Sequence, residues 1–268
     1  MHRRSLLAGI CGMLALVSTN ASGTMPVRQQ GERSARELIV ELDSVEAVVR
    51  ARAACALRDL GDRAADALTP LVKLLADGSP VEGSVCTRRW WRGGSNDLTS
   101  PGEQAAAALA AIGSRAFQPV VTALKSDAWI ARRNAAWALG ALDDERAAPA
   151  LIDTLRDREA AVREQAAWAL GAIDTPDAVP ALLTTLKDGD AKVRRQSAWA
   201  LGAIDDPRAV DGLMGALGDP SADVREQAAW ALGAVGDSRA LSGLVGALKD
   251  SSAGVRRQAA WAIGVIGR

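Results

Sequence analysis

Apolar and polar residues repeat with a fixed period from about residue 34 onward. Residues 134–140 read NAAWALG, residues 165–171 read QAAWALG, and similar segments surround Trp199, Trp230 and Trp261. The step between successive tryptophans is 31 residues each time. A recurring period of this size indicates an internal repeat and is typical of a solenoid built from stacked units.

The apolar pattern within each unit predicts two short helices. In one unit, residues 180–186 have helical apolar spacing, with Pro180 in the first turn, where its missing N–H costs nothing. Residues 187–190 predict a turn and residues 193–204 a second helix. Two such helices cannot bury a core alone, but stacked neighbours can. The sequence therefore predicts an all-α solenoid of about seven antiparallel helix pairs, beginning near residues 34, 62, 114, 145, 176, 207 and 238.

The second helix of each unit directs its tryptophan away from its own core. On a helical projection Val162, Ala166 and Leu170 share one face, whereas Trp168 and Gly171 lie opposite. Because glycine costs about 1 kcal/mol in a helix relative to alanine, its recurrence predicts a close contact, with an indole as the candidate partner. We expect a row of indoles outside the core, or packed sideways on the next unit, made by Trp137, Trp168, Trp199, Trp230 and Trp261.

Charge alternates beside this row, four residues before each tryptophan. One interpretation is a series of ion pairs between units, each worth about 0–1 kcal/mol at the surface. The other is a groove that binds a peptide, because Trp and Arg are enriched at binding hot spots. The two interpretations are compatible. The alternating residues are Arg133, Glu164, Arg195, Glu226 and Arg257.

The position before these residues is Arg in nearly every unit, and the preceding turn often carries Asp. An Arg that reaches the turn carbonyls or the Asp of an adjacent unit would fix the angle between units. Recurrence in unit after unit favours this structural role over contact with a ligand. The residues are Arg50, Arg132, Arg163, Arg194, Arg225 and Arg256, with Asp157, Asp188, Asp219 and Asp250.

Residues 77–102 interrupt the repeat with a loop rich in Gly, Ser and Pro. Long loops in compact repeats are usually functional or disordered, and the adjacent Trp90 and Trp91 argue against simple disorder. With neighbouring arginines they form a patch suited to binding a partner. The alternative is a loop that folds over the first units as a cap.

The N-terminus predicts an export signal. Residues 1–4 are basic, residues 5–17 are apolar, and residues 19–21 offer a cleavage site. We expect a signal peptide at 1–21, a linker at 22–33, and a periplasmic or secreted product. Arg3 and Arg4 also resemble a twin-arginine signal. The alternative is a frayed apolar N-terminus on a cytosolic protein.

Two cysteines remain once the signal peptide is removed, Cys55 and Cys86. An even pair in an exported protein suggests a disulfide. Cys55 replaces the tryptophan of the first unit, and Cys86 lies in the loop that could fold onto it. We predict a Cys55–Cys86 bond. The alternative is a free, buried Cys55.

The repeat resembles the short HEAT-like repeats first described in phycobilisome lyases. The resemblance covers residues 34–268 and rests on V-R-x-x-A-A-x-A-L-G in the second helix and A-x-x-x-L in the first. It implies a right-handed α-solenoid in which the second helices, and with them the row of indoles, line the concave surface. Two related families are phycobilin lyases and deoxyhypusine hydroxylase, which binds di-iron through His-Glu pairs. No such pair occurs here.

Composition argues against catalysis. The only histidine, His2, lies in the signal peptide, which removes His-based triads and metal sites from the mature chain. The mature chain carries 30 basic and 32 acidic residues, which argues against a nucleic-acid partner. We therefore expect an exported, non-catalytic scaffold without a cofactor or a membrane span, which binds a protein or peptide. The alternatives are a lyase-type enzyme or accessory subunit, and a self-assembling repeat protein. For self-association we expect an exposed apolar face in the last unit, around Leu244, Val245, Leu248 and Ile263.

Overall fold

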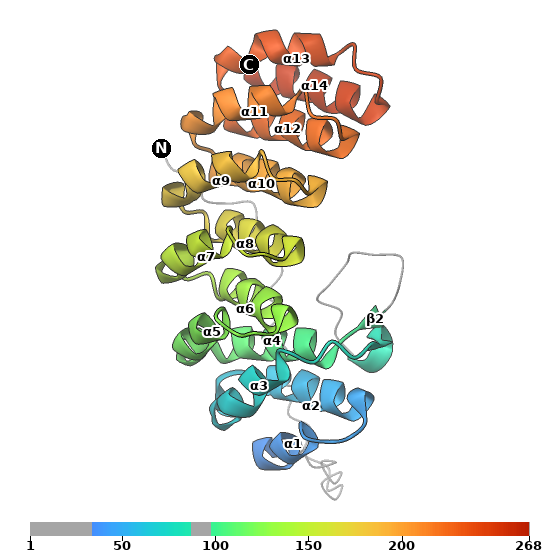
Figure 1. Cartoon of the computed structure of the whole chain (residues 1–268), viewed down its shortest axis with the longest axis vertical. Helices are drawn as coiled ribbons and strands as arrows, with labels where there is room; N and C mark the ends of the chain where they lie inside the picture. Colours follow the sequence, from blue (N-terminus) through green and yellow to red (C-terminus); the bar gives the residue numbers. More distant parts are fainter. Residues whose placement is uncertain (1–33, 87–97, 268) are drawn as a thin grey trace, which may run out of the picture. The chain divides into compact units, whose positions relative to one another are not determined.

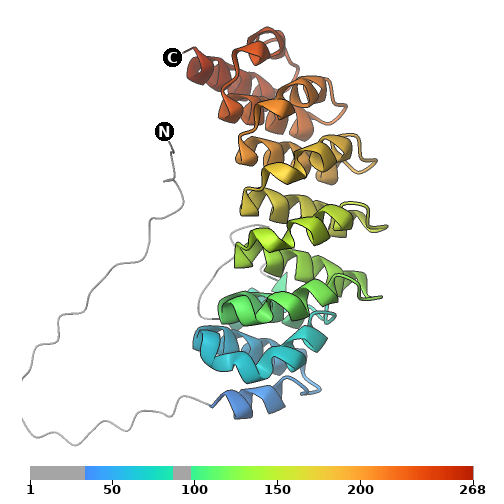
Figure 2. The same cartoon turned by 90° about the vertical axis from the view of Figure 1, so that its left-hand side faces the viewer.

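A computed structural model of the chain describes residues 34–86 and 98–267. There the helices form seven antiparallel pairs that stack along one axis (Figures 1 and 2). This confirms the predicted all-α solenoid. We call the pairs units 1 to 7; the odd-numbered helix is the first of its unit and the even-numbered helix the second. No helix in the described residues is long and apolar enough to cross a membrane.

The helix lengths repeat as regularly as the sequence. The first helices are α1 (Ala35–Glu41), α3 (Leu68–Leu74), α5 (Phe117–Ala123), α7 (Ala148–Thr154), α9 (Val179–Thr185), α11 (Val210–Ala216) and α13 (Leu241–Ala247). The second helices are α2 (Ala47–Leu60), α4 (Pro101–Ile112), α6 (Trp129–Leu142), α8 (Ala160–Ile173), α10 (Ala191–Ile204), α12 (Ala222–Val235) and α14 (Ala253–Ile266). Short 3-10 turns lie at Gly61–Ala67, Gly83–Val85, Gly113–Ala116, Glu145–Ala147, Pro176–Ala178, Pro207–Ala209 and Ser238–Ala240.

Successive second helices approach each other very closely at the repeated glycine. A Cβ atom at Gly171 would lie 2.8 Å from Cα of Ala200 and 2.7 Å from Cζ3 of Trp199. The same contact recurs at Gly140, Gly202 and Gly233 with the next unit. The predicted contact between glycine and indole is therefore confirmed, and its partner is the indole of the following unit. The glycine is required because any side chain would push the two helices apart.

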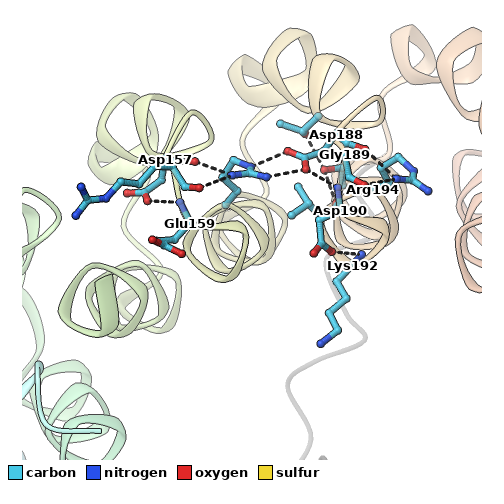
Figure 3. Close-up of polar contacts among 12 residues, drawn as sticks. Asp157, Glu159, Asp188, Gly189, Asp190, Lys192 and Arg194 are labelled. Atoms are coloured by element: carbon cyan, nitrogen blue, oxygen red, sulfur yellow. Dashed lines mark hydrogen bonds and ion pairs between the residues drawn. The ribbon is translucent and has the colours of Figure 1, made fainter. Parts of the chain in front are cut away.

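The arginine before the alternating charges joins three segments. Arg163 Nη1 donates to the carbonyl of Asp157 in its own turn at 2.8 Å, while Nε and Nη2 donate to Asp188 of the next turn at 2.7 and 2.8 Å. Asp188 in turn accepts the N–H of Asp190 at 2.9 Å (Figure 3). Bidentate Arg–carboxylate contacts are strong and directional. They fix the angle between units, as predicted.

We call this series the Arg–Asp ladder. Its side chains are largely buried, which strengthens the charge-assisted hydrogen bonds relative to a surface pair. Arg50 makes the equivalent contact to Asp77 through Nε alone, at 2.7 Å. The bidentate rungs are Arg132–Asp157, Arg163–Asp188, Arg194–Asp219 and Arg225–Asp250.

One rung of the ladder is replaced, between units 2 and 3. Gly102 of α4 occupies the position of the arginine, and Ser126 occupies the position of the aspartate. A Cβ atom at Gly102 would lie 2.7 Å from the carbonyl oxygen of Leu75. The buried Asn134 instead donates to this carbonyl at 2.9 Å, and the Gly102 N–H donates to the carbonyl of Asp77 at 2.9 Å. The side-chain amide of Asn134 thus crosses the joint between units 2 and 3, while the main-chain bond of Gly102 closes the turn within unit 2.

The inserted segment differs from the prediction in two ways. It contains a short antiparallel ribbon in which β1 (Val81–Glu82) pairs with β2 (Leu98–Thr99). It also ends before residue 102, because Ser100 caps α4 and Pro101 is its first residue. Proline is favoured at this helical position. The helix α4 therefore begins at Pro101, two residues before the position 103 that the predicted loop of 77–102 implied. Trp90 and Trp91 lie outside the described residues, as do the signal peptide at 1–21 and the linker at 22–33.

The expected apolar face of the last unit is wrong at Leu244. Leu244 is fully buried, whereas Val245 and Leu248 are exposed and Ile263 is half-buried. Its counterparts Leu182 and Leu213 are also fully buried. This leucine is covered by its own unit and the preceding one, and its burial does not require a following unit.

The chain offers a matched test of the close helix contact. We expect Gly171→Ala to destabilise the fold by about 1–3 kcal/mol, because the new methyl group overpacks against Trp199 and Ala200. Gly264→Ala is the control: nothing lies within 4 Å of its added Cβ, and alanine is up to about 1 kcal/mol better in a helix. Urea unfolding followed by circular dichroism measures both. Equal effects of the two substitutions would contradict the contact.

The ladder predicts how stability depends on pH. The hydrogen bond from Arg225 and the N–H of Ser252 hold the pKa of Asp250 at about 2, below its ordinary value of 3.8. Hydrogen bonds from Arg163 likewise lower the pKa of Asp188 against the opposing effect of burial. A carboxyl whose folded-state pKa is depressed stabilises the fold fully above the unfolded pKa. That stabilisation disappears as the pH falls from 3.8 toward about 2.

We therefore expect the free energy of unfolding to fall steeply between these two pH values. Asp250→Asn should be less stable near neutral pH, because it lacks the carboxylate that pairs with Arg225. It should also lose less stability on acidification, because one carboxyl with a depressed pKa is missing. Urea titrations at a series of pH values measure this. An acid profile of Asp250→Asn that runs parallel to the wild type would show that the ladder does not govern acid unfolding.

Candidate functional site

The five indoles predicted to form a row do so on the second-helix face. Four of them, Trp137, Trp168, Trp199 and Trp230, are half-buried and pack against the core, and Trp261 is 44% exposed. We call these five residues the indole row. Each indole from Trp168 onward covers the glycine of the preceding unit with one ring edge. The indole row therefore takes part in the packing between units and is also partly exposed at the surface.

The spacing of the row is known at one step. The rings of Trp137 and Trp168 are parallel to within 4°, and their centroids are 6.1 Å apart. Packed helix axes are normally about 8–10 Å apart. Equivalent atoms on neighbouring units are therefore closer together here than typical helix axes, which is the relation expected on the inner, concave side of a curved stack.

The indole nitrogens remain available for a partner. In the described part of the chain no indole N–H of the row donates to another residue. No side-chain nitrogen or oxygen there is buried without a hydrogen-bond partner. The N–H groups of the row therefore reach the surface, where each can donate one hydrogen bond.

The alternating charges form separate pairs and not a continuous ladder. Arg133 bonds to Glu103 at 2.8 Å, Arg195 lies 3.7 Å from Glu164, and Arg257 bonds to Glu226 at 3.0 Å. Each arginine thus pairs with the preceding unit. Glu103 occupies the alternating position of α4 and continues the pattern by one unit. Glu103 was not predicted from the sequence, because alanine replaces the tryptophan of that unit.

A hollow of about 340 Å³ lies between units 5, 6 and 7 on this face. Trp199 and Trp230 form its apolar wall, and Gln227 and Gln258 add carboxamides. Charged groups border it, namely Arg195, Asp223 and Glu226. Asp223 is exposed and makes no ion pair with another described residue. The hollow therefore combines indole surface with a carboxylate that is open to a ligand.

A second column of carboxylates lies at the ends of the second helices. Asp143, Asp174 and Asp205 end α6, α8 and α10 in the left-handed conformation, with φ between 53° and 57°. Burial raises the pKa of Asp174, and the neighbouring charges of Asp143 and Glu145 add to the effect. Among the described residues no group of three His, Cys, Asp or Glu is arranged to hold a metal ion. We therefore assign this column to helix termination.

The two cysteines lie together at the start of the stack. The structure joins Cys55 of α2 to Cys86 of the insertion as a disulfide, with Cα atoms 5.9 Å apart. The carbonyl oxygen of Gln104 lies 3.3 and 3.2 Å from the two sulfur atoms. Gln104 also donates to Thr99 of the ribbon at 2.9 Å. The insertion is thus attached to units 1 and 2 where Cys55 replaces the tryptophan.

The family model described as HEAT repeats matches residues 103–164, 149–223 and 210–268, and the PBS lyase HEAT-like repeat model matches residues 49–77. The chain belongs to the HEAT repeat family. No curated protein sequence matches it. The resemblance to short HEAT-like repeats is therefore confirmed.

Several solved structures are similar to this HEAT-repeat chain. Kap95p, the yeast importin-β, studied with RanGDP, is 15% identical, with a TM-score of 0.63 over 86% of this chain and 37% of that chain. E. coli YibA is 22% identical, with a TM-score of 0.58 over 87% and 81% of the two chains. The CpcE–CpcF complex of phycocyanin lyase from Nostoc sp. PCC7120 is 23% identical, with a TM-score of 0.48 over 92% and 99%. The first two similarities show the fold, and this chain spans about a third of Kap95p.

The disulfide gives a prediction for stability. Its bond closes a loop with a sequence separation of 31 residues, for which the chain-entropy relation gives about 3–4 kcal/mol. We expect Cys55→Ala/Cys86→Ala, or reduction by dithiothreitol, to lower the urea midpoint accordingly. The double variant should not respond further to dithiothreitol. A wild-type midpoint that is the same with and without reductant would contradict the bond.

Proposed function

We propose that this HEAT-repeat protein is an exported, non-catalytic scaffold that recognises a polypeptide partner through the indole row and its flanking charges. The observation that carries the proposal is the hollow between Trp199 and Trp230, bordered by Asp223 and Glu226. Indoles that are anchored at one edge and exposed at the other offer rigid contact area at little entropic cost, as at binding hot spots. Trp90 and Trp91 of the insertion would extend this surface.

Two further observations support a scaffold. The repeated Arg, Asp and Gly residues are used for stacking, and the residues that remain on the surface of the second helices are aromatic, amide and charged groups. Kap95p, which shares the fold, is a protein that binds RanGDP. Export rests on the sequence of residues 1–21 alone. Self-association through the last unit would use Val245 and Leu248 and stays a prediction.

Affinity capture from envelope extracts of the source organism tests the proposal. We expect the wild-type chain to retain a polypeptide that Trp199→Ala/Trp230→Ala loses, because both indoles line the hollow. These tryptophans also support packing, so a second variant, Asp223→Arg, changes only an exposed carboxylate. The matched control is Asp66→Arg, an exposed aspartate in the 3-10 turn between α2 and α3, in units other than those that line the hollow.

The outcome is decisive when all variants retain the helical circular dichroism of the wild type. The proposal is supported if Trp199→Ala/Trp230→Ala and Asp223→Arg both lose the captured polypeptide while Asp66→Arg retains it. Equal capture by every variant would move the binding surface away from the indole row. Retention of a bilin absorbance or a stoichiometric metal ion by the purified chain would favour the lyase-type alternative instead.

A further inference from the structure

Four glutamines lie beside the indole row, and their side chains form no hydrogen bond within the described residues. Gln165, Gln196, Gln227 and Gln258 stand three residues before their tryptophans, one in each of units 4 to 7. All four are half-buried, and within residues 34–86 and 98–267 none of their side chains makes a hydrogen bond. Each therefore presents both a free carbonyl oxygen and a free NH₂ group.

The corresponding amides of the earlier units are used internally. Gln104 donates to Thr99, and Asn134 donates to the carbonyl of Leu75 while it accepts from Arg133. The free amides thus begin in unit 4, one unit after the first bidentate rung and the first indole of the row. Because no side-chain nitrogen or oxygen of the described residues is buried without a hydrogen-bond partner, the amide groups of the later glutamines are open to water or to a ligand.

We propose that these four glutamines, the amide row, hold the main chain of a partner segment bound as an extended strand along the indole row. This inference rests on the proposed function and specifies the conformation of its ligand. In a strand, the N–H and C=O of one residue point to the same edge, and those of the next residue point to the other. One carboxamide can accept from that N–H and donate to that C=O.

The one ring spacing that the row defines is compatible with this arrangement. The ring centroids of Trp137 and Trp168 are 6.1 Å apart, and two residues of a strand span about 6.4–6.8 Å. We expect units 4 to 7 to repeat this interval, so that every second residue of the partner meets an equivalent glutamine. A helical partner cannot use the amide row in this way, because its N–H and C=O groups are bonded within the helix. About eight extended residues would cover the four units.

The hollow between Trp199 and Trp230 selects one kind of side chain. Its walls are indoles, and the carboxylate of Asp223 is exposed without an ion-pair partner among the described residues. Glu226 is already paired with Arg257 at 3.0 Å. A lysine or arginine fits both features, because its stem packs on aromatic surface and its charge reaches Asp223. The partner is therefore an extended segment with a basic residue opposite units 5 and 6.

Randomised peptides of about twelve residues, selected on the folded chain, supply the probe. The strongest binder is resynthesised in two forms, N-methylated at one set of alternate residues or at the other, which removes the N–H groups of one edge only. We expect one form to bind about tenfold or more weakly, as loss of about 1.4 kcal/mol requires, and the other to bind like the parent. Fluorescence anisotropy measures each Kd.

Matching substitutions in the chain complete the test. Gln196→Leu and Gln227→Leu should each weaken the parent peptide about tenfold, while Gln118→Leu on the first helix α5 should leave its Kd unchanged. Asp223→Asn should weaken the parent but not a peptide whose basic residue is replaced by norleucine. Selection that yields no binder, equal effects of both methylated forms, or wild-type affinity of the two glutamine variants would overturn the inference.

The two proposals fail separately. If Trp199→Ala/Trp230→Ala and Asp223→Arg lose the captured polypeptide while Gln196→Leu/Gln227→Leu retains it, the scaffold function holds and the extended strand is wrong. If the tryptophan and Asp223 variants capture normally, the indole row is not the binding surface and both proposals fall.

Discussion

The close approach of each repeated glycine to the second helix of the next unit sets the geometry of the indole row. Because Gly140, Gly171, Gly202 and Gly233 lack a side chain, the following helix approaches until its indole edge and an alanine touch the backbone. Each tryptophan from Trp168 onward is thereby fixed at one edge and left open at the other. The indole row is therefore a consequence of packing, and any partner meets rings whose positions are set by the core.

The Arg–Asp ladder acts on the same joint from the turn side of each unit. Arg163 ties its own turn to Asp188 of the next, and the aspartate also caps the turn that carries it. Two kinds of contact, one apolar and one charged, thus determine the position of each unit relative to the last. Between units 2 and 3 both ladder residues are replaced together, as Gly102 and Ser126, and Asn134 instead donates to the carbonyl of Leu75 across the joint. The replacement of both partners avoids a buried charge without a counterion, which would cost several kcal/mol.

Most of this could be predicted from the sequence, because a residue that recurs at the same place in each unit has the same neighbours in each unit. The pairing of helices, the indole on glycine and the bridging arginine all follow from that rule. Where the repeat fails, prediction failed too. The ribbon at 81–82 and 98–99 has no counterpart elsewhere, and the signal for the missing rung is spread over Gly102, Ser126 and Asn134 in two different units. Leu244 was misplaced because the last unit was expected to expose every apolar residue that a further unit would have covered, whereas its own helix pair buries this one.

The amide row shows a different limit. Glutamine at a recurring helical position carries no charge and no obvious chemistry, so its type alone suggests solvent exposure. Only the structure separates Gln104 and Asn134, which bond to the main chain and side chains of their own fold, from the later glutamines, which do not. A fold built by repetition of one unit also repeats any free group from unit to unit. The interval between the rings of Trp137 and Trp168, 6.1 Å, approaches the two-residue repeat of a strand. If the amides keep this interval, a set of individually weak groups becomes a matched template for a polypeptide main chain.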